Sequence, residues 1–188
     1  MTRNRHGSAV IEYPGELEIV TTREFDAPVE LVFDVLTKPE HVRHWFAPFE
    51  DKMTVCSIDL RAGGDYHMVF VTPDGKQCSF RGTYLEVEPP TRIVQTWLFE
   101  GWPDAEAVET DTLKETDGVT KLTVTMAFRD QAGRDHMTKH DGQESSFDKL
   151  EDYLMSLLGV TASESTAQPA VRPARQEAGA PVVRRSRP

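Results

Sequence analysis

The sequence predicts an α+β domain in which a curved antiparallel sheet of about seven strands wraps around one long C-terminal helix. Three observations support this prediction. Apolar and polar residues alternate over most of residues 17–128, turns rich in Gly and Pro interrupt the alternation, and a helical spacing of apolar residues follows from about residue 134. A sheet of this kind encloses an apolar cavity, so the first functional question is which molecule fits inside.

The first strand and the two short helices after it have clear start and stop signals. Residues 17–25 alternate apolar and polar side chains, which is typical of a strand. Asp26 can cap a first helix whose opening turn accepts Pro28. Thr37, with Glu40 three residues later, fits the capping box of a second helix. We therefore expect a strand that leads into two consecutive short helices.

Six more strands are expected to complete the sheet, at residues 53–60, 66–71, 77–88, 92–99, 108–114 and 121–128. Gly63 and Gly64 supply the positive φ values that a tight turn needs, and residues 73–75 supply a second turn. Gly82 marks a point where the sheet can bend. Residues 134–158 then predict one long amphipathic helix. Its apolar stripe consists of Phe147, Leu150, Leu154 and Leu157.

Length and composition predict one domain with two tails. A chain of 188 residues, of which 38% are apolar, can bury one core. We expect a flexible segment at residues 1–14, the domain at residues 15–159 and a disordered tail at residues 160–188. The tail has no aromatic residue, so it cannot bury enough apolar surface to offset its ordering entropy.

The charge and the cysteines narrow the range of partners and compartments. The formal charge of −10 argues against general binding to nucleic acid or to anionic membranes. Residues 161–188 contain five arginines and two glutamates, so a basic surface is expected only there. The chain has no apolar run of roughly 18 residues and no recognisable secretory signal, which favours a cytosolic location. Cys56 and Cys78 lie on different predicted strands and are expected to be free thiols.

Five segments, in this order, resemble a known superfamily. They are Arg23-Glu24-Phe25-Asp26-Ala27-Pro28, Lys38-Pro39-Glu40-His41 with Trp45, Asp59-Leu60-Arg61-Ala62-Gly63-Gly64, Gly82-Thr83-Tyr84-Leu85-Glu86-Val87, and Pro89-Pro90-Thr91-Arg92-Ile93-Val94 with Thr96-Trp97. They are similar to the SRPBCC superfamily, and more narrowly to its branch that resembles the C-terminal domain of the activator of heat-shock protein 90 ATPase. The resemblance covers residues 15–158 and implies the helix-grip fold.

This resemblance implies a fold with an internal cavity more clearly than it implies an activity. Members of the superfamily include lipid carriers, cyclases, antibiotic-sequestering proteins and cochaperone-like domains, so the fold leaves the function open. One departure is visible, because the branch often carries Gly-Trp in the first half of the last helix, where this chain has Asp141-Gly142-Gln143-Glu144. The missing aromatic is expected to leave that end of the cavity more polar or more open.

Large apolar side chains are expected to line the cavity. The predicted ligand-binding residues are Trp45, Phe46, Met53, Met68, Phe70, Phe80, Tyr84, Trp97, Phe99, Met126, Phe147 and Leu150. Tyr84, Gln95 and His67 are the nearest candidates for polar groups that orient a ligand. The competing interpretation is that the same aromatics form only a core, since large aromatic side chains are normally buried for stability.

The histidines do not form a recognisable metal or catalytic motif. His136 and His140 are four residues apart, as ligands on a helix would be, but the Glu of a zinc-protease helix and a third ligand are missing. His41 and His44 are expected on an exposed face of the second short helix. We therefore predict no metal site.

The acidic residues of one predicted strand region are expected to be solvated. They are Asp104, Glu106, Glu109 and Asp111, and they lack the ligand spacing of a calcium loop. Gly63 and Gly64 do not form a phosphate loop, because no Gly-Lys-Ser/Thr follows. We predict no cofactor and name no catalytic residue.

The sequence thus favours a cytosolic domain, monomeric or homodimeric, that binds a small hydrophobic molecule without catalysis. Two alternatives stay open. A cochaperone-like domain would contact a protein partner through its acidic surface or its Arg-rich tail. A cyclase or dehydratase acting on a polyketide-like substrate would use His44, His67 or Tyr84 as the acid or base.

Overall fold

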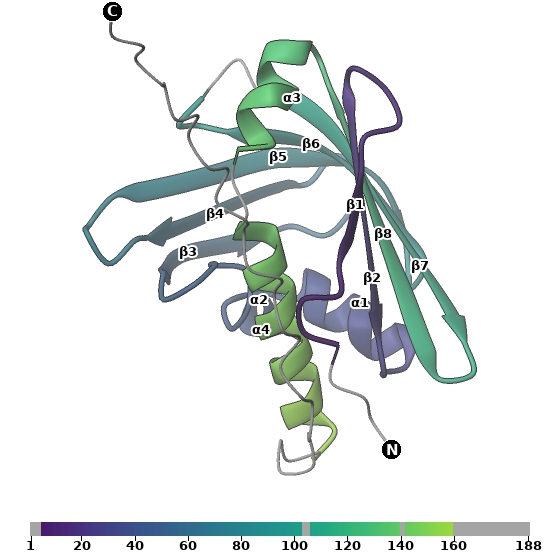
Figure 1. Ribbon diagram of the computed structural model, residues 1–188. Helices are drawn as coiled ribbons and strands as arrows, with labels where there is room; N and C mark the ends of the chain where they lie inside the picture. Colours follow the sequence, from purple (N-terminus) through teal and green to yellow (C-terminus); the bar gives the residue numbers. More distant parts are fainter. Residues whose placement is uncertain (1–4, 103–105, 140–141, 160–188) are drawn as a thin grey trace, which may run out of the picture.

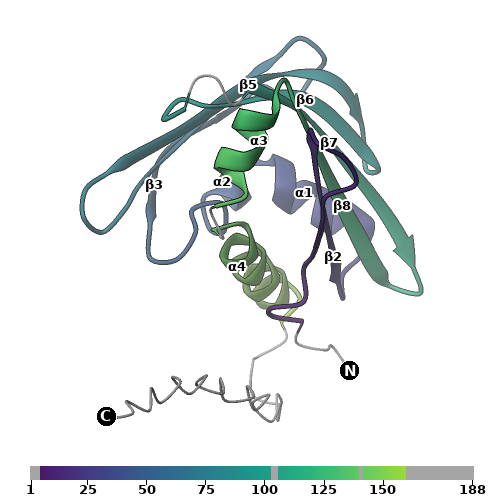
Figure 2. The same cartoon turned by 45° about the horizontal axis from the view of Figure 1, so that its top comes forward.

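The computed structural model describes residues 5–102, 106–139 and 142–159, which form one curved antiparallel sheet that partly encloses the helices (Figures 1 and 2). The strand order across the sheet is β1-β2-β8-β7-β6-β5-β4-β3. The strands are β1 (Val10–Glu12), β2 (Glu18–Phe25), β3 (Lys52–Ile58), β4 (Asp65–Val71), β5 (Gln77–Glu88), β6 (Arg92–Phe99), β7 (Glu106–Thr116) and β8 (Val119–Phe128). Every neighbouring pair is antiparallel. The predicted fold class is confirmed.

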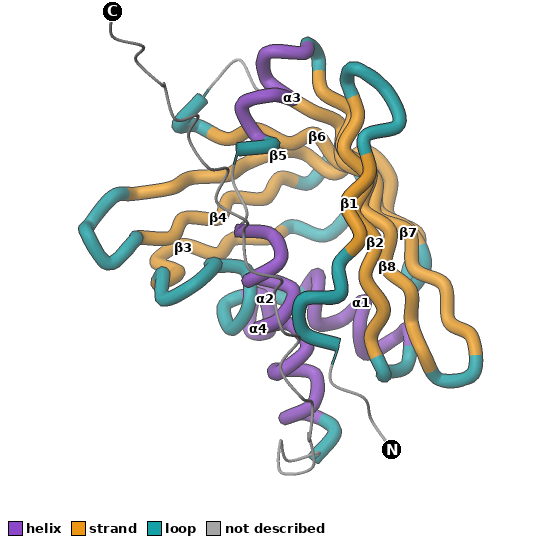
Figure 3. Tube along the Cα trace, viewed as in Figure 1, coloured by secondary structure: helices purple, strands orange, loops and turns teal. Residues whose placement is uncertain are grey.

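The helices are α1 (Val29–Thr37), α2 (Pro39–Val42), α3 (Gln131–Met137) and α4 (Gly142–Leu157). They lie between the two arms of the curved sheet (Figure 3), with α4 below α3 in Figure 1. Helix α1 packs against α4, β7 and β8, while α2 packs against β3 and α3 against β8. No helix within the described ranges is long and apolar enough to cross a membrane.

Irregular pairing accompanies the curvature of the sheet. The registers of β5–β6 and of β3–β4 each shift by a bulge. At Gly82, an added Cβ would lie 1.8 Å from the carbonyl oxygen of Thr96, so only glycine permits this close approach of β5 to β6. The glycine that the sequence marks as a bend is therefore required by the backbone.

The core consists of two apolar clusters on the concave face of the sheet. The larger cluster joins Phe25 of β2 and Leu122 of β8 to Leu150 and Leu154 of α4, all of which are fully buried. The smaller cluster consists of Ile19, Trp97, Ala107 and Phe128, with Met137 of α3 packed against it. Helices α3 and α4 thus cover different parts of the concave face.

The N-terminal segment differs from the expectation of a flexible tail at residues 1–14. Residues 10–12 form β1, which pairs with β2 and adds an eighth strand to the predicted seven. Residues 5–9 donate backbone hydrogen bonds to carboxylates of α4. These partners lie more than 130 residues away, so local composition gave no sign of them. The predicted tail at residues 160–188 lies outside the described ranges.

The long C-terminal helix expected over residues 134–158 is two helices. Asp130 is the N-cap of α3, and its carboxylate accepts a hydrogen bond of 2.8 Å from the N–H of Gly133. Helix α3 ends at Met137, and the apolar stripe that begins at Phe147 belongs to α4. The prediction treated the apolar spacing of two separate helices as that of one continuous helix.

The caps of the first two helices also differ from the prediction. Pro28 is the N-cap of α1, and Asp26 instead accepts hydrogen bonds from the Arg5 guanidinium. Lys38 is the N-cap of α2, and the Thr37 hydroxyl donates to the carbonyl of Phe33 at 2.7 Å. Neither predicted side-chain cap forms, although both helices lie where they were expected.

Candidate ligand-binding site

Aromatic rings from three adjacent strands meet on the concave face. Phe80 of β5 is the centre of this ring cluster, with centroid distances of 5.0 Å to Phe99, 5.5 Å to Trp97 and 5.7 Å to Phe70. Phe46, which follows α2, reaches the same ring at 5.8 Å. These are favourable aromatic separations. The cluster brings together side chains that are separated by more than 50 positions in the sequence.

All twelve predicted ligand-binding residues belong to the interior of the domain. Trp45, Phe46, Met53, Met68, Tyr84, Met126, Phe147 and Leu150 belong to or pack against the larger apolar cluster. Phe80, Trp97 and Phe99 belong to or pack against the smaller one, and Phe70 joins through its ring contacts. Met126 contacts both clusters. Their contact with a ligand stays a prediction.

Two carboxylates lie within this apolar face. Glu109 of β7 is the cross-strand partner of Gln95 and Met126, and Asp111 is the partner of Ile93 and Val124. Cross-strand partners project from the same face of a sheet. Since Ile93 and Val124 are buried in the larger cluster, both carboxylates face the concave side. We call Gln95, Glu109 and Asp111 the acidic interior site.

The described residues satisfy only part of the hydrogen-bonding capacity of the acidic interior site. The side-chain nitrogen Nε2 of Gln95 donates to Oε1 of Glu109 at 2.7 Å. Oδ1 of Asp111 is buried and has no hydrogen-bond partner among the described residues. No Lys, Arg or His in the described ranges forms an ion pair with Glu109 or Asp111. A buried carboxylate oxygen without a donor is uncommon in folded proteins.

Burial changes the acidity of this region. It raises the pKa of Glu109 to about 7, against the lowering effect of the hydrogen bond from Gln95. The pKa of Asp111 is also raised well above its usual value, first by burial and then by the charge of Glu109. Burial likewise raises the pKa of the Tyr66 and Tyr84 phenols, so both stay protonated at neutral pH.

Several side chains of the concave face keep accessible surface although they lie deep within the domain. They are Phe46, Phe80, Gln95, Phe99, Glu109, Asp111 and Met126. Tightly packed core side chains lose nearly all of theirs, as Leu122 and Leu150 do. The helices therefore cover the ring cluster and the acidic interior site incompletely, which leaves surface for a further molecule to contact.

Comparison with protein families identifies the chain. The family model described as Activator of Hsp90 ATPase homolog 1-like protein matches residues 26–155. The chain belongs to this family. No curated protein matches the chain.

Solved structures similar to this family member share its fold. A protein from Rhodobacter sphaeroides aligns over 79% of this chain and 98% of its own, with a TM-score of 0.74 and 22% identity, which shows the fold alone. A protein from Nitrosomonas europaea aligns over 78% of this chain and 99% of its own, with a TM-score of 0.69 and 27% identity. CalU16 from Micromonospora echinospora aligns over 76% of this chain and 80% of its own, with a TM-score of 0.52 and 26% identity.

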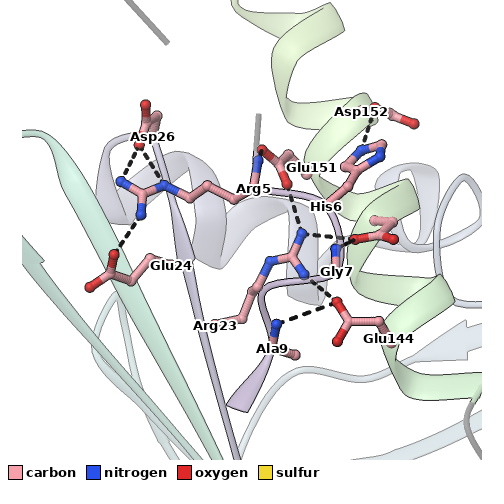
Figure 4. A network of polar contacts seen from close by, with 11 residues as sticks. Arg5, His6, Gly7, Ala9, Arg23, Glu24, Asp26, Glu144, Glu151 and Asp152 are labelled. Carbon is pink, nitrogen blue, oxygen red and sulfur yellow. Dashed lines mark hydrogen bonds and ion pairs between the residues drawn. The ribbon is translucent and has the colours of Figure 1, made fainter. Parts of the chain in front are cut away.

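A buried arginine fixes α4 against the sheet in this member of the family (Figure 4). The side chain of Arg23 on β2 has 0% accessible surface and donates to the carboxylates of Glu144, Asp148 and Glu151. The backbone N–H of Arg5 donates to Glu151 at 2.7 Å. We call these residues the Arg23 network, and sequence reasoning did not assign them any role.

The position where this chain departs from the Gly-Trp of its branch lies beside the Arg23 network. Gln143 accepts a hydrogen bond of 2.9 Å from the hydroxyl of Thr21, and Glu144 is bound by Arg23. This end of α4 is thus joined to β2 by polar contacts, in keeping with the expected polar character. Asp141 lies outside the described residues.

Three ligand atoms of the Arg23 network lie close enough to suggest a metal site. His6, Asp148 and Glu151 each offer one atom, and these atoms lie within 4.8 Å of one another. The Arg23 guanidinium already donates to both carboxylates. Because its positive charge occupies their side of the cluster, the arrangement is better suited to an ion-pair network than to a cation site.

The expectation of a solvated acidic face was wrong for two of its four residues. Glu106 is exposed and forms an ion pair with Arg129, whereas Glu109 and Asp111 face the interior. Asp104 lies outside the described residues. The strand alternates, so residues 109 and 111 share the inward face with the buried Ala107 and Leu113. That alternation was the signal that the prediction missed.

The histidines do not converge with Tyr84. His67 faces the outer side of the sheet, where its ring lies 3.0 Å from the Ser79 hydroxyl, so it cannot orient a ligand inside. His44 is exposed, as predicted, and stacks on Tyr153. His41 is half-buried rather than exposed, and its Nδ1 lies 2.9 Å from the Tyr153 hydroxyl.

Two other predictions concern His136 and the cysteines. His136 stacks on Trp102 with centroids 4.1 Å apart, while His140 lies outside the described residues. Cys56 and Cys78 are free thiols, as expected, and burial raises the pKa of both. A raised thiol pKa disfavours the reactive thiolate.

A groove with a volume of about 710 Å³ crosses the outer side of the sheet from β4 to β8. Its basic side chains are already paired, with Arg81 bound to Glu100 at 2.8 Å and Arg129 bound to Glu106 at 2.9 Å. The groove is a second candidate surface, separate from the ring cluster and the acidic interior site.

Proposed function

We propose that this protein binds a small, largely apolar molecule between the concave face of the sheet and helices α3 and α4. The observation that carries the proposal is the ring cluster around Phe80, in which Phe46, Phe80 and Phe99 keep accessible surface while Phe70 and Trp97 are buried behind them. Ligand pockets typically combine such apolar walls with a few polar groups. The acidic interior site supplies polar groups at one side of the cluster.

The twelve interior residues named from the sequence differ in their expected part in binding. Part-exposed side chains such as Phe80 and Phe99 have surface that a ligand can cover. Fully buried Leu150 supports the wall from behind. Membership in a superfamily that includes lipid carriers agrees with this reading. The proposal requires no cofactor.

A ligand screen tests the proposal. Thermal unfolding is measured with apolar fluorophores and lipid-like compounds, and binding of at least one class is expected to raise the unfolding temperature. Phe80→Leu is expected to weaken binding roughly tenfold, since it removes several ring contacts. Val35→Ala is the matched control, because Val35 is fully buried in α1 outside the ring cluster and should lose stability but not affinity. Absence of binding across the whole panel would exclude the proposal.

A second candidate function is a cochaperone-like protein contact. The outer groove and the family assignment favour it. Replacing Leu98 and Val108, outward residues that line the groove, by Asp should abolish capture of a protein partner without changing ligand binding inside. Pull-down with and without residues 161–188 would separate the groove from the tail as the contact. Either function is expected in the cytosol, in a monomer or homodimer.

A further inference from the structure

The acidic interior site contains more negative charge than the described protein neutralises. Glu109 and Asp111 are two residues apart on the same strand and project to the same side. Among the residues that the structure describes, Gln95 donates to Glu109, and one buried oxygen of Asp111 has no donor. A buried acceptor left in this state costs stability, and a bound molecule that donates a hydrogen bond to it would remove that cost.

The residues beside the site indicate the chemical character of a molecule that could bind there. Tyr84, Gln95, Glu109 and Met126 form one cross-strand row on the concave face. The row on one side contains Ile93, Asp111 and Val124, and the row on the other contains Trp97, Ala107 and Phe128. The carboxylates are thus flanked by aliphatic and aromatic side chains, and aromatic faces also attract cations.

We propose that the site selects ligands that carry a basic nitrogen on an aromatic or otherwise apolar body, with the carboxylates of Glu109 and Asp111 holding the nitrogen. This inference rests on the proposed function, because it presupposes that the apolar body enters beside the ring cluster. An ammonium group brings both the missing donor for Asp111 and a positive charge for the pair. A hydroxyl brings only the donor, and a ligand carboxylate is repelled.

A metal ion fits the site less well than an organic cation. Glu109 and Asp111 are only two acidic ligands, and the one group of three close metal-ligating side chains found among the described residues lies instead in the Arg23 network. Calcium takes six to eight oxygen ligands and magnesium demands a near-ideal octahedron. The apolar neighbours on both sides of the carboxylates also favour a ligand with an apolar body.

Three matched aromatic compounds test the inference. Naphthylethylamine, naphthylethanol and naphthylacetic acid differ mainly in the polar end group, and their affinities are measured by isothermal titration calorimetry at about pH 8, above the pKa of about 7 of Glu109. We expect the affinity of the amine to exceed that of the alcohol by roughly tenfold or more. The reason is that a hydrogen bond to a charged group contributes more binding free energy than a neutral one. The acid should bind most weakly.

Variants assign the preference to the site. In the double variant Glu109→Gln with Asp111→Asn, the amine and the alcohol should bind with similar affinity, while alcohol binding stays close to that of the wild type. Glu106→Gln is the matched control, since Glu106 is an exposed residue of the same strand, and it should keep the full preference. Lowering the pH to about 5.5 should reduce amine binding to the wild type, because protons then compete for the carboxylates.

The possible results separate this inference from the function on which it rests. Equal binding of amine and alcohol to the wild type, or a preference that persists in the double variant, overturns the inference and leaves the proposed function standing. Binding of none of the three compounds overturns the inference, and the wider panel of apolar fluorophores and lipid-like compounds then decides whether the proposed function stands. Unfolding curves of each variant verify that the protein compared is folded.

Discussion

At the scale of single residues, Arg23 links the sheet to α4 through three ion pairs. Its guanidinium has lost all contact with water and is surrounded by three carboxylates of one helix (Figure 4). A charged side chain is almost never buried completely without such partners. Its removal would leave the acidic side chains of α4 facing one another without a counter-charge.

Replacing Arg23 by Met should therefore destabilise the protein by about 3–5 kcal/mol, because breaking a buried ion pair from one side leaves uncompensated charge. Arg81→Met is the matched control, since Arg81 forms a single ion pair on the surface and its side chain is 57% exposed. The control should cost about 1 kcal/mol or less. Urea unfolding measures both. Similar losses for the two variants would show that the Arg23 network does not hold the fold together.

Residues differ in how far the sequence reveals their place. The aromatic side chains of the candidate site followed from alternation, because a large apolar residue on a half-buried strand faces the core. A cluster of acidic residues is usually solvated, and this expectation was wrong for Glu109 and Asp111. Both lie at the same alternate positions of β7 as the buried Leu113, and therefore on its inward face. The role of Arg23 depends on partners more than 120 residues away, which no local pattern contains.

At the scale of elements, turn and bend residues determine the shape of the sheet. Asp117 and Gly118 adopt positive φ in the turn between β7 and β8, which suits a tight hairpin. Gly82 lets β5 approach β6 closely. The turn and the bend were predictable, because glycine residues mark both positions in the sequence. The boundary between α3 and α4 was not, because both helices have apolar residues at compatible spacing.

Gly82→Ala is expected to lower stability by about 1–3 kcal/mol, the usual cost of forcing an extra methyl group into a packed position. The new Cβ would lie 1.8 Å from the Thr96 oxygen, so β5 and β6 must separate. In contrast, Gly15→Ala adds a methyl group with no atom within 4 Å and should be neutral. Thermal unfolding compares them. An unchanged midpoint for Gly82→Ala would mean that the sheet relaxes freely at this bend.

At the scale of the whole molecule, the acidic interior site links stability to pH. A carboxyl whose pKa is raised by folding binds protons more tightly in the folded state than in the unfolded one. The pKa of Glu109 rises from 4.5 to about 7 and that of Asp111 also rises, both chiefly through burial. Ionisation of Glu109 therefore costs no folding stability below about pH 4.5, and this cost grows as the pH rises toward about 7. Asp111 adds a cost of the same sign, because its pKa is also raised.

Removing both charges should reverse this penalty. The double variant Glu109→Gln with Asp111→Asn is expected to be more stable than the wild type by about 1–3 kcal/mol at pH 8, because one unit of pKa shift corresponds to about 1.4 kcal/mol. The difference should shrink toward zero near pH 4.5. Urea unfolding over this range measures it as a difference between the two proteins, which cancels the effect of protonating the Arg23 network. Glu106→Gln should follow the wild type throughout. A gap that does not change with pH would show that folding does not raise the pKa of either carboxyl, which would contradict the burial of the acidic interior site.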